Sequence, residues 1–326
     1  MSKIIVTGGC GYIGSHTCIA LLAQGHEVVV FDDLSNATKE SIDRIEKIAG
    51  KRPELCIVDL KNKNATSAAF EAHKEALAVI HFAAYKAVKE SLDLPLQYYE
   101  NNFFSLINTL TAQQKLGINN FIFSSSATVY GMPETCPVTE KSPVSTPFSP
   151  YGNTKKIAEE ILKDHTAANL DFSVISLRYF NPIGAHKSGE IGELPNGIPN
   201  NLMPYITQTA AGIREKLMVF GNDYPTKDGT AIRDYIHVMD LAEAHVVAVN
   251  RLVDQKQEQN FEIYNLGTGT GYSVLEVITA FETQNNLSIN YEITARRDGD
   301  VPVVFASIEL ASKKLGWTAK RDLNSM

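Results

Sequence analysis

The glycine-rich stretch near the amino terminus constrains the fold of this chain more than any other feature. Residues 4–6 are apolar and predict a buried strand, and the glycines that follow open a predicted helix. Gly9, Gly11 and Gly14 fit the pattern G-x-G-x-x-G, while Gly8, Gly11 and Gly14 recur at every third position. Residues without a Cβ let pyrophosphate oxygens approach backbone N–H groups at the positive end of a helix. The stretch therefore predicts a dinucleotide site, although by itself it is equally typical of a bare tight turn.

An acidic residue after the second predicted strand supports the dinucleotide interpretation. That strand covers residues 27–31, and Asp32 follows it, 18 residues beyond Gly14. At this position a carboxylate accepts hydrogen bonds from an adenosine ribose 2′-OH. No arginine stands beside Asp32, so the sequence predicts NAD rather than NADP as the cofactor. The alternative is a solvated aspartate at the end of a strand.

Strand-like and helix-like stretches alternate from the first strand to about Arg178. Further strands are predicted at 55–58, 79–82, 121–125 and 172–177. This alternation predicts an α/β fold with a Rossmann-type, doubly wound parallel sheet and helices on both faces. Ligands bind beyond the carboxyl ends of such strands, which makes the following residues candidates for cofactor contacts: Asp59, Leu60, Phe82, Ala83 and Ser124. Taken singly, each is equally consistent with a strand-end cap or with ordinary packing.

The composition of the sequence changes after Arg178. Glycine and proline crowd residues 181–199 and predict a smaller, loop-rich α/β lobe. Strands predicted at 234–238 and 261–266, on either side of a helix at 238–252, are expected to return to the main sheet. We therefore expect a discontinuous substrate-binding lobe. The predicted NAD-binding domain is 1–180 with returning segments at about 234–266, and the predicted nucleotide-sugar lobe is 181–233 with 267–326.

Composition excludes several classes of protein. Lys and Arg number 30 against 37 Asp and Glu, and the net charge of −7 has no long runs, which argues against nucleic-acid or membrane partners. The four cysteines show neither a C-x-x-C pair nor metal-ligand spacing, so we expect reduced packing residues and no metal. The first apolar run stops at Val6, too short for a signal peptide. These features predict a cytoplasmic protein.

Tyr151 and Lys155 are the candidate acid–base pair. They follow Ser149 and Pro150, a typical helix start, and lie four residues apart on one face. A tyrosine titrates near pH 10, so acting as a base near neutrality requires a fall of roughly 3 units, about 4 kcal/mol. A cation about 4 Å away supplies roughly 4 kcal/mol at an effective dielectric of 20. Burial itself raises a phenol's pKa, so a second cation such as oxidised nicotinamide would help.

Ser126 completes the candidate catalytic set. It follows the strand at 121–125 and is placed to hold a substrate hydroxyl between a phenolate and a hydride acceptor. The alternatives are a turn-capping serine at 126 and an exposed helical pair at 151 and 155. Together with the glycine loop, the three residues predict a redox site.

These motifs resemble those of a known family, the extended short-chain dehydrogenase/reductases. The resemblance covers nearly the whole chain and rests on the segments 6–16, 124–131, 151–155, 177–182, 198–202, 220–226, 233–237 and 296–300. It implies an isomerase that keeps its NAD and inverts C4 of UDP-hexoses through a 4-keto sugar, interconverting UDP-glucose and UDP-galactose. It also implies a homodimer joined through the helices predicted around 96–116 and 151–169.

The resemblance further implies roles for individual residues. Tyr151 would take the proton of the sugar 4-hydroxyl, and Lys155 would bond the nicotinamide ribose. The implied cofactor residues are Tyr12, Ile13, Asp32, Asp33, Leu34, Asn36, Asp59, Leu60, Phe82, Ala83, Lys86, Asn101, Tyr179 and Phe180. The implied substrate residues are Asn181, Asn201, Leu202, Phe220, Arg233, Tyr235, Arg297 and Asp300. Guanidinium forks at 233 and 297 match diphosphate oxygens, although each arginine seen singly also suits a surface ion pair, and Phe220 suits either a uracil face or the core.

Three rival functions remain to be weighed. A nucleotide-sugar 4,6-dehydratase would carry an Asp-Glu pair after Ser126, and a decarboxylating relative would carry a glutamate, whereas this chain has Ala127 and Thr128. A non-catalytic NAD-binding protein of this fold would be expected to lose Tyr151 or Lys155.

Val304 stands where some relatives carry a tyrosine beside the sugar C2, so the chain is expected to admit N-acetylated sugars as well. The alternative is a plain strand valine.

Overall fold

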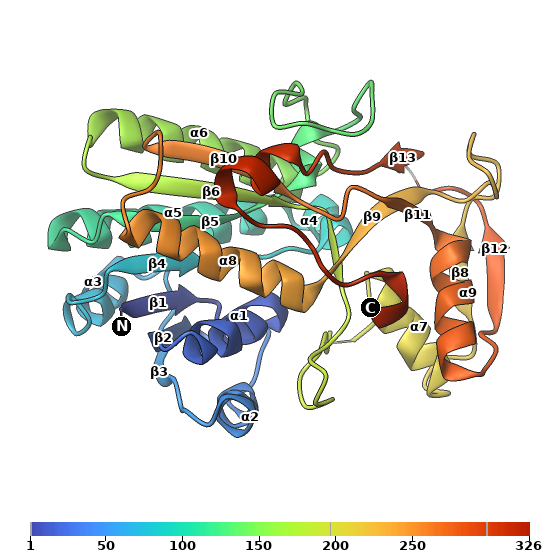
Figure 1. Ribbon diagram of the computed structural model, residues 1–326, viewed down its shortest axis with the longest axis horizontal. Helices are drawn as coiled ribbons and strands as arrows, with labels where there is room; N and C mark the ends of the chain where they lie inside the picture. Colours follow the sequence, from blue (N-terminus) through green and yellow to red (C-terminus); the bar gives the residue numbers. More distant parts are fainter. Residues whose placement is uncertain (1, 196, 298) are drawn as a thin grey trace.

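A seven-stranded parallel sheet forms the larger unit in the computed structural model, which describes residues 2–195, 197–297 and 299–326 (Figure 1). Its strands are β1 (Lys3–Thr7), β2 (Glu27–Asp32), β3 (Glu54–Ile57), β4 (Ala78–His81), β5 (Asn120–Ser126), β6 (Ser173–Tyr179) and β10 (Phe261–Leu266). They lie in the order β10-β6-β5-β4-β1-β2-β3, and every pair is parallel. This is the doubly wound Rossmann arrangement, so the predicted fold class is confirmed.

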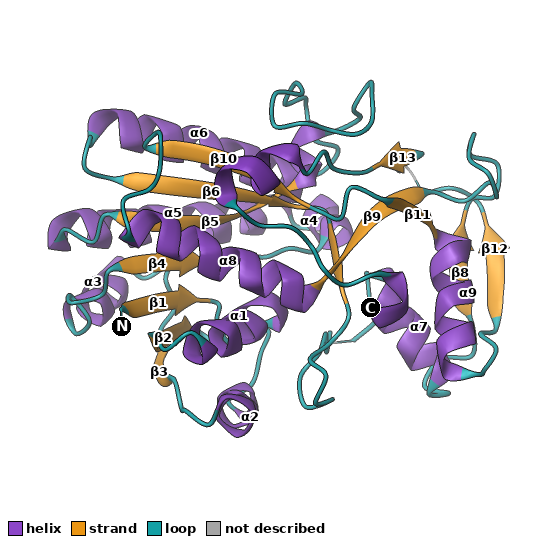
Figure 2. Cartoon of the chain, viewed as in Figure 1, coloured by secondary structure: helices purple, strands orange, loops and turns teal. Residues whose placement is uncertain are grey.

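Helices cover both faces of this sheet (Figure 2). One face carries α1 (Tyr12–Ala23), α2 (Glu40–Ala49) and α8 (Val238–Val253), and the other carries α3 (Lys63–Glu71), α5 (Pro95–Leu116) and α6 (Pro150–Ala168). Successive residues of a strand point to opposite faces. Ile4 and Val6 accordingly pack in one apolar cluster, and Ile5 packs in the other. Burial on both faces explains why these strands are continuous apolar runs.

A second, smaller unit follows β6 in the chain. Its strands are β7 (Asn181–Ile183), β8 (Leu217–Phe220), β9 (Ile232–His237), β11 (Gly271–Ser273), β12 (Tyr291–Thr294) and β13 (Val303–Val304), with helices α7 (Leu202–Ala210) and α9 (Val274–Asn285). β9 pairs with β7, β11 and β13, and β8 pairs with β12. An apolar cluster centred on Ile206, Val219 and Val277 joins the helices to these strands.

The prediction that residues 234–238 return to the main sheet is wrong, because β9 belongs to the smaller sheet. Hydrogen bonds hold β9 in the smaller sheet. The carboxylate of Asp234, a buried residue of β9, accepts them from the backbone of Thr268 (2.7 Å), Gly269 and Ala306 (both 3.1 Å). The chain re-enters the larger unit one element later, with α8. The second predicted return is confirmed, since β10 pairs with β6 along its whole length.

The carboxyl-terminal segment folds back onto α8. Ala311, Leu315 and Trp317 pack in the core of the larger unit, and the Asp240 carboxylate accepts backbone hydrogen bonds from Lys320 and Arg321. The prediction that this segment belongs to the smaller lobe is therefore only partly correct: Ala311, Leu315 and Trp317 pack on the larger unit, whereas Leu323 and Met326 pack on the smaller one. No helix within the described ranges combines the length and apolar character needed to span a bilayer.

Candidate active site

The glycine loop between β1 and α1 is closely packed and leaves the start of the helix open. A Cβ on Gly8 would lie 2.8 Å from the backbone nitrogen of Ala83, and one on Gly14 would lie 2.3 Å from the Gly8 carbonyl oxygen. Gly8 has a φ of +68°, a region that favours glycine. Gly11 caps α1 without any side-chain hydrogen bond, so nothing from the cap occupies the first N–H groups. The loop therefore presents the free helix end that binds phosphate groups.

Asp32 lies at the end of β2, beside this loop. Its Oδ2 accepts a hydrogen bond from the Cys10 backbone (3.0 Å), and its Oδ1 accepts one from the Leu34 backbone (2.9 Å). Burial raises the pKa of the carboxyl, and the two backbone hydrogen bonds oppose that rise. Only 8% of the residue is exposed, so the alternative of a solvated aspartate is wrong. Each oxygen keeps a lone pair for a further donor.

The remaining predicted cofactor residues surround the carboxyl ends of the strands. Asp33 binds Ser35, Asp59 binds the Lys61 backbone, and Asn101 donates to Asn102. Tyr179 ends β6, and its hydroxyl bonds the ring of the buried His245. Phe180 packs in a small apolar cluster with Val129 and Tyr130. The other predicted cofactor residues occupy the loop and strand ends as follows: Tyr12 and Ile13 begin α1, Leu34 and Asn36 follow β2, Leu60 follows β3, and Phe82, Ala83 and Lys86 follow β4.

Tyr151 and Ser126 come together at the carboxyl end of β5. Ser149 caps α6 by accepting a hydrogen bond from the Gly152 backbone (3.1 Å), which places Tyr151 in the first turn. Burial raises the pKa of the Tyr151 phenol to about 12, and a hydrogen bond with Ser126 opposes the rise. Ser126 also caps the 3-10 helix at Ala127–Tyr130 through Thr128, so the turn-capping role considered for it is present too.

Lys155 lies one turn after Tyr151 and is buried. Its Nζ donates to the Ser124 carbonyl oxygen (2.6 Å) and lies 5.9 Å from the centre of the Tyr151 ring. Burial lowers the pKa of the ammonium to about 7, against the opposing effect of the Glu159 carboxylate. Lys155 was expected to lower the pKa of Tyr151, but in this structure burial raises that pKa, and the opposing influence is the hydrogen bond with Ser126. A second cation near the phenol, which the sequence suggested would help, would oppose this rise in the pKa of Tyr151.

A buried ion pair behind these residues was not predicted. Glu159 accepts hydrogen bonds from Arg178 Nε (3.0 Å) and Nη2 (2.6 Å), from Ser125 (2.6 Å) and from Ser176 (2.9 Å). Arg178 also donates to the Tyr130 hydroxyl (2.8 Å). The pair joins α6 to β6, and the hydrogen bond from Ser125, which lies between Ser124 and Ser126, links it to the end of β5. Glu159 stands four residues after Lys155 on the same helix face. That spacing was the one sign in the sequence that Glu159 lies near the site.

A second cluster forms in the smaller unit. The Asp300 carboxylate accepts hydrogen bonds from Arg233 (3.1 Å) and from Arg297 (3.1 Å). The Arg297 guanidinium lies over the ring of Phe220, 4.9 Å from its centre, and that ring is 38% exposed. Four predicted substrate residues thus lie together, although their sequence positions span 220–300. Two guanidinium groups beside an exposed aromatic ring suit a diphosphate attached to a planar base.

The other predicted substrate residues flank this cluster. Asn181 begins β7, Asn201 caps α7, and Leu202 is the first residue of that helix. Tyr235 lies on β9 and is buried in the apolar cluster of the smaller unit. Val304 lies on β13, paired with Arg233 of β9.

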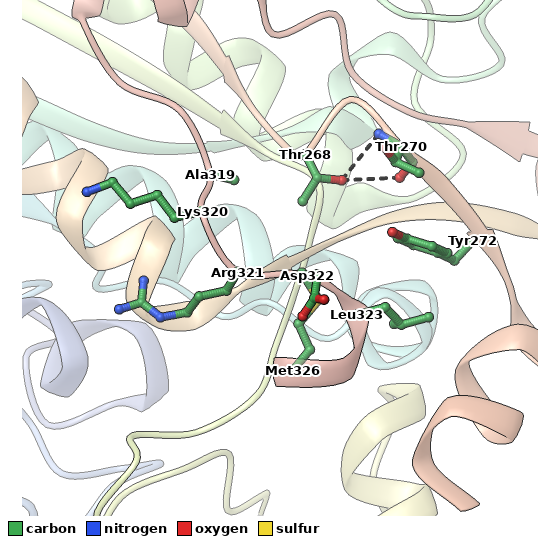
Figure 3. Close-up of a pocket in the computed structure, with 9 residues that line it drawn as sticks. All are labelled: Thr268, Thr270, Tyr272, Ala319, Lys320, Arg321, Asp322, Leu323 and Met326. Atoms are coloured by element: carbon green, nitrogen blue, oxygen red, sulfur yellow. Dashed lines mark hydrogen bonds between the residues drawn. The ribbon is translucent and has the colours of Figure 1, made fainter. Parts of the chain in front are cut away.

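A cavity of about 220 Å³ lies elsewhere, between the carboxyl-terminal segment and the turn that precedes β11 (Figure 3). Its lining includes Thr268, Tyr272 and Arg321, but none of the predicted cofactor or substrate residues. Arg321 is already held by Asp240 and Glu243. The candidate active site is therefore the one at the carboxyl ends of the parallel strands. No group of three or more His, Cys, Asp or Glu in the described part of the chain is placed to hold a metal ion.

Comparison with known proteins decides the family. Residues 4–267 match the model of the NAD dependent epimerase/dehydratase family. The chain belongs to that family. A UDP-glucose 4-epimerase of Bacillus subtilis is 53% identical over 99% of this chain and 94% of its own length. The family assignment agrees with the resemblance predicted from the sequence motifs.

Solved structures of the family agree closely with this fold. A UDP-glucose 4-epimerase from Stenotrophomonas maltophila, with bound NAD and formylated UDP-arabinopyranose, has a TM-score of 0.96 and 48% identity, covering 100% of this chain and 96% of that one. The enzyme from Bifidobacterium longum, in complex with NAD+ and UDP, has a TM-score of 0.94 and 43% identity, covering 100% and 96%.

Proposed function

We propose that this protein is an NAD-dependent isomerase that inverts C4 of UDP-hexoses and interconverts UDP-glucose and UDP-galactose. The observation that carries the proposal is the assembly of Tyr151, Ser126 and Lys155 at the carboxyl end of β5, within a fold shared with UDP-glucose 4-epimerases. NAD belongs at the glycine loop and at Asp32, and the UDP-sugar belongs at the arginine cluster of the smaller unit. The seven-stranded unit is accordingly the proposed NAD-binding domain.

The residues of the chain divide the chemistry between them. Tyr151 accepts the proton of the sugar 4-hydroxyl and returns it after inversion, while Ser126 orients that hydroxyl. Burial lowers the pKa of Lys155 to about 7, so the protonation state of its amine depends on the charge of the neighbouring phenol. NAD, when bound, supplies the hydride acceptor for C4 and, in its oxidised form, a second positive charge near Tyr151. Arg233 and Arg297 hold the diphosphate while the 4-keto sugar rotates to present its other face.

The dehydratase alternative receives no support from the site. Elimination of the 6-hydroxyl needs a further acid and base next to Ser126. Ala127 and Thr128 stand there, and the Thr128 hydroxyl donates to Ser126 at 3.0 Å. A non-catalytic NAD-binding protein would have no need for a buried lysine beside a tyrosine.

We also propose that the protein is a cytoplasmic homodimer. Large apolar side chains are exposed on the segment from α4 (Val88–Asp93) through α5, including Leu92 (57%), Leu96 (80%) and Phe104 (50%). Several large exposed apolar groups on consecutive helices are typical of a contact with another chain. The expected dimer would cover them with the same helices of a second copy.

Substitution of Tyr151 by Phe tests the proposed function. We expect Y151F to lose interconversion of UDP-galactose and UDP-glucose by at least about 100-fold while the purified protein still carries NAD, because only the proton acceptor is removed. The matched control is Y99F, which removes a phenol that binds Asn153 on the neighbouring helix. Unaltered turnover in Y151F would refute the assigned role.

Val304 supports a second substrate class. Its small side chain leads us to propose that UDP-GlcNAc and UDP-GalNAc are interconverted as well. In a V304Y variant we expect this second activity to fall much more than turnover of UDP-galactose, as measured by chromatography of the products. Failure of the unaltered protein to form any UDP-GalNAc would contradict the proposal.

A further inference from the structure

The segment of residues 184–195, which follows β7, packs against the larger unit. At its start the Gly184 carbonyl accepts a hydrogen bond from the Tyr12 hydroxyl (2.6 Å). Further along, the Glu190 carboxylate pairs with Lys47 of α2 (2.6 Å), and Ile191 is buried in the core of the larger unit. The segment is therefore fixed beside the glycine loop.

Glu193 in this segment joins the two proposed binding regions. Its Oε1 accepts hydrogen bonds from Lys86 Nζ (3.2 Å) and from Asn201 Nδ2 (2.7 Å). Lys86 is a proposed cofactor residue of the larger unit, and Asn201 is a proposed substrate residue at the start of α7. Lys86 also lies near Tyr12, with Nζ 5.8 Å from the ring centre. One carboxylate oxygen thus ties a cofactor residue to a substrate residue.

The other oxygen of Glu193 lacks a partner. Only 10% of the side chain is exposed, and Oε2 is buried without a hydrogen bond to any described residue. A buried acceptor without a donor is unfavourable, and more so when it carries charge. A ligand phosphate at neutral pH has no proton to offer, whereas the hydroxyl groups of a ribose or a hexose are donors. A hydroxyl group of a bound sugar would supply the missing donor.

We propose, resting on the function proposed above, that Glu193 is a ligand-binding residue whose Oε1 positions Lys86 and Asn201 and whose Oε2 accepts a hydrogen bond from a hydroxyl group of the bound nucleotide. An ammonium has three N–H donors, so Lys86 keeps two for phosphate oxygens while one remains on Glu193. The carboxylate and a bound diphosphate can therefore share this lysine. Both NAD and the UDP-sugar carry suitable hydroxyls, and the experiment distinguishes them.

Variants E193Q and E193A test the proposal against E190Q, a matched control in the same segment whose ion pair with Lys47 is largely solvent-exposed. The purified holoenzymes are compared by the NAD retained per chain, by the affinity for UDP measured calorimetrically, and by KM and kcat for UDP-galactose. We expect E193Q and E193A to weaken NAD retention or raise KM about tenfold or more, with kcat within about threefold. E190Q should match the unaltered protein.

Each outcome has a distinct meaning. Lost NAD with unchanged KM assigns the hydroxyl to NAD, and retained NAD with raised KM assigns it to the UDP-sugar. Unchanged values in both variants overturn the proposal, as does an equal loss in E190Q, which would reflect folding of the segment alone. If the unaltered protein keeps NAD but does not interconvert the sugars, the proposed function fails, while NAD retention still decides the role of Glu193.

Discussion

The buried pair of Glu159 and Arg178 allows a stability prediction with a definite sign and size. The two side chains are 8% and 3% exposed, and two hydrogen bonds join them. Replacing Glu159 by Gln keeps the shape but leaves the guanidinium without a countercharge in a dry interior. Breaking a buried pair in this way costs about 3–5 kcal/mol. We expect E159Q, and likewise R178M, to lose stability by that amount.

The double variant separates the effect of charge from that of packing. In E159Q/R178M neither charge is left uncompensated, so we expect it to lose clearly less than the sum of the two single variants. E309Q is the control: Glu309 and Lys313 are 74% and 71% exposed, so we expect removal of this surface pair to change the stability very little. Urea denaturation of the four variants at one fixed NAD concentration measures these differences, because bound ligand adds to apparent stability.

Two results would refute this reasoning. One is an E159Q protein within about 1 kcal/mol of the unaltered chain, which would mean that water reaches the pair. The other is a double variant whose loss equals the sum of the single losses. Glu159 also binds Ser125, next to Ser124 and Ser126, so E159Q should lower kcat. Turnover equal to that of the unaltered protein would show that the pair does not position the site.

Two further predictions concern the glycine loop and the buried histidines. Gly14→Ala should yield protein with little bound NAD, because the new Cβ would lie 2.3 Å from the Gly8 carbonyl oxygen. In Gly11→Ala the Cβ would lie 3.3 Å from that oxygen, so this variant should lose much less NAD. Equal NAD contents in the two variants would contradict this prediction. Burial lowers the pKa values of several histidines, among them His16, His237 and His245 to about 4 and His81 to about 3. The unfolded chain therefore binds protons that the folded chain does not, and stability is lost as the pH falls from about 6.5 toward 4. In His81→Gln the slope near pH 5.5 should fall by about 1.4 kcal/mol per pH unit, one proton's worth; parallel curves for the two proteins would contradict it.

Much of this protein follows from its sequence because the relevant patterns are local. The apolar run at 4–6, the glycines after it and Asp32 lie within one strand–helix–strand unit, so their spacing alone predicts the dinucleotide site. Tyr151 and Lys155 are likewise a local pattern, because residues four apart on a helix lie on the same face. The alternation of strands and helices likewise determines the parallel sheet, because each crossover helix must cover the apolar face that its strands present.

Only the tertiary structure decided the pairing of β9. Its partners β7, β11 and β13 come from separate parts of the chain, and the sequence of β9 does not record which of them dock beside it. The tertiary structure also decided that Asp300 holds both Arg233 and Arg297, and that Glu193 meets Lys86 across 107 residues of sequence. Such contacts depend on where whole elements dock, and no local period records that. Desolvation has the same origin: the phenol of Tyr151 becomes a weaker acid because surrounding elements exclude water from it, a property of the assembled fold rather than of its neighbours along the chain.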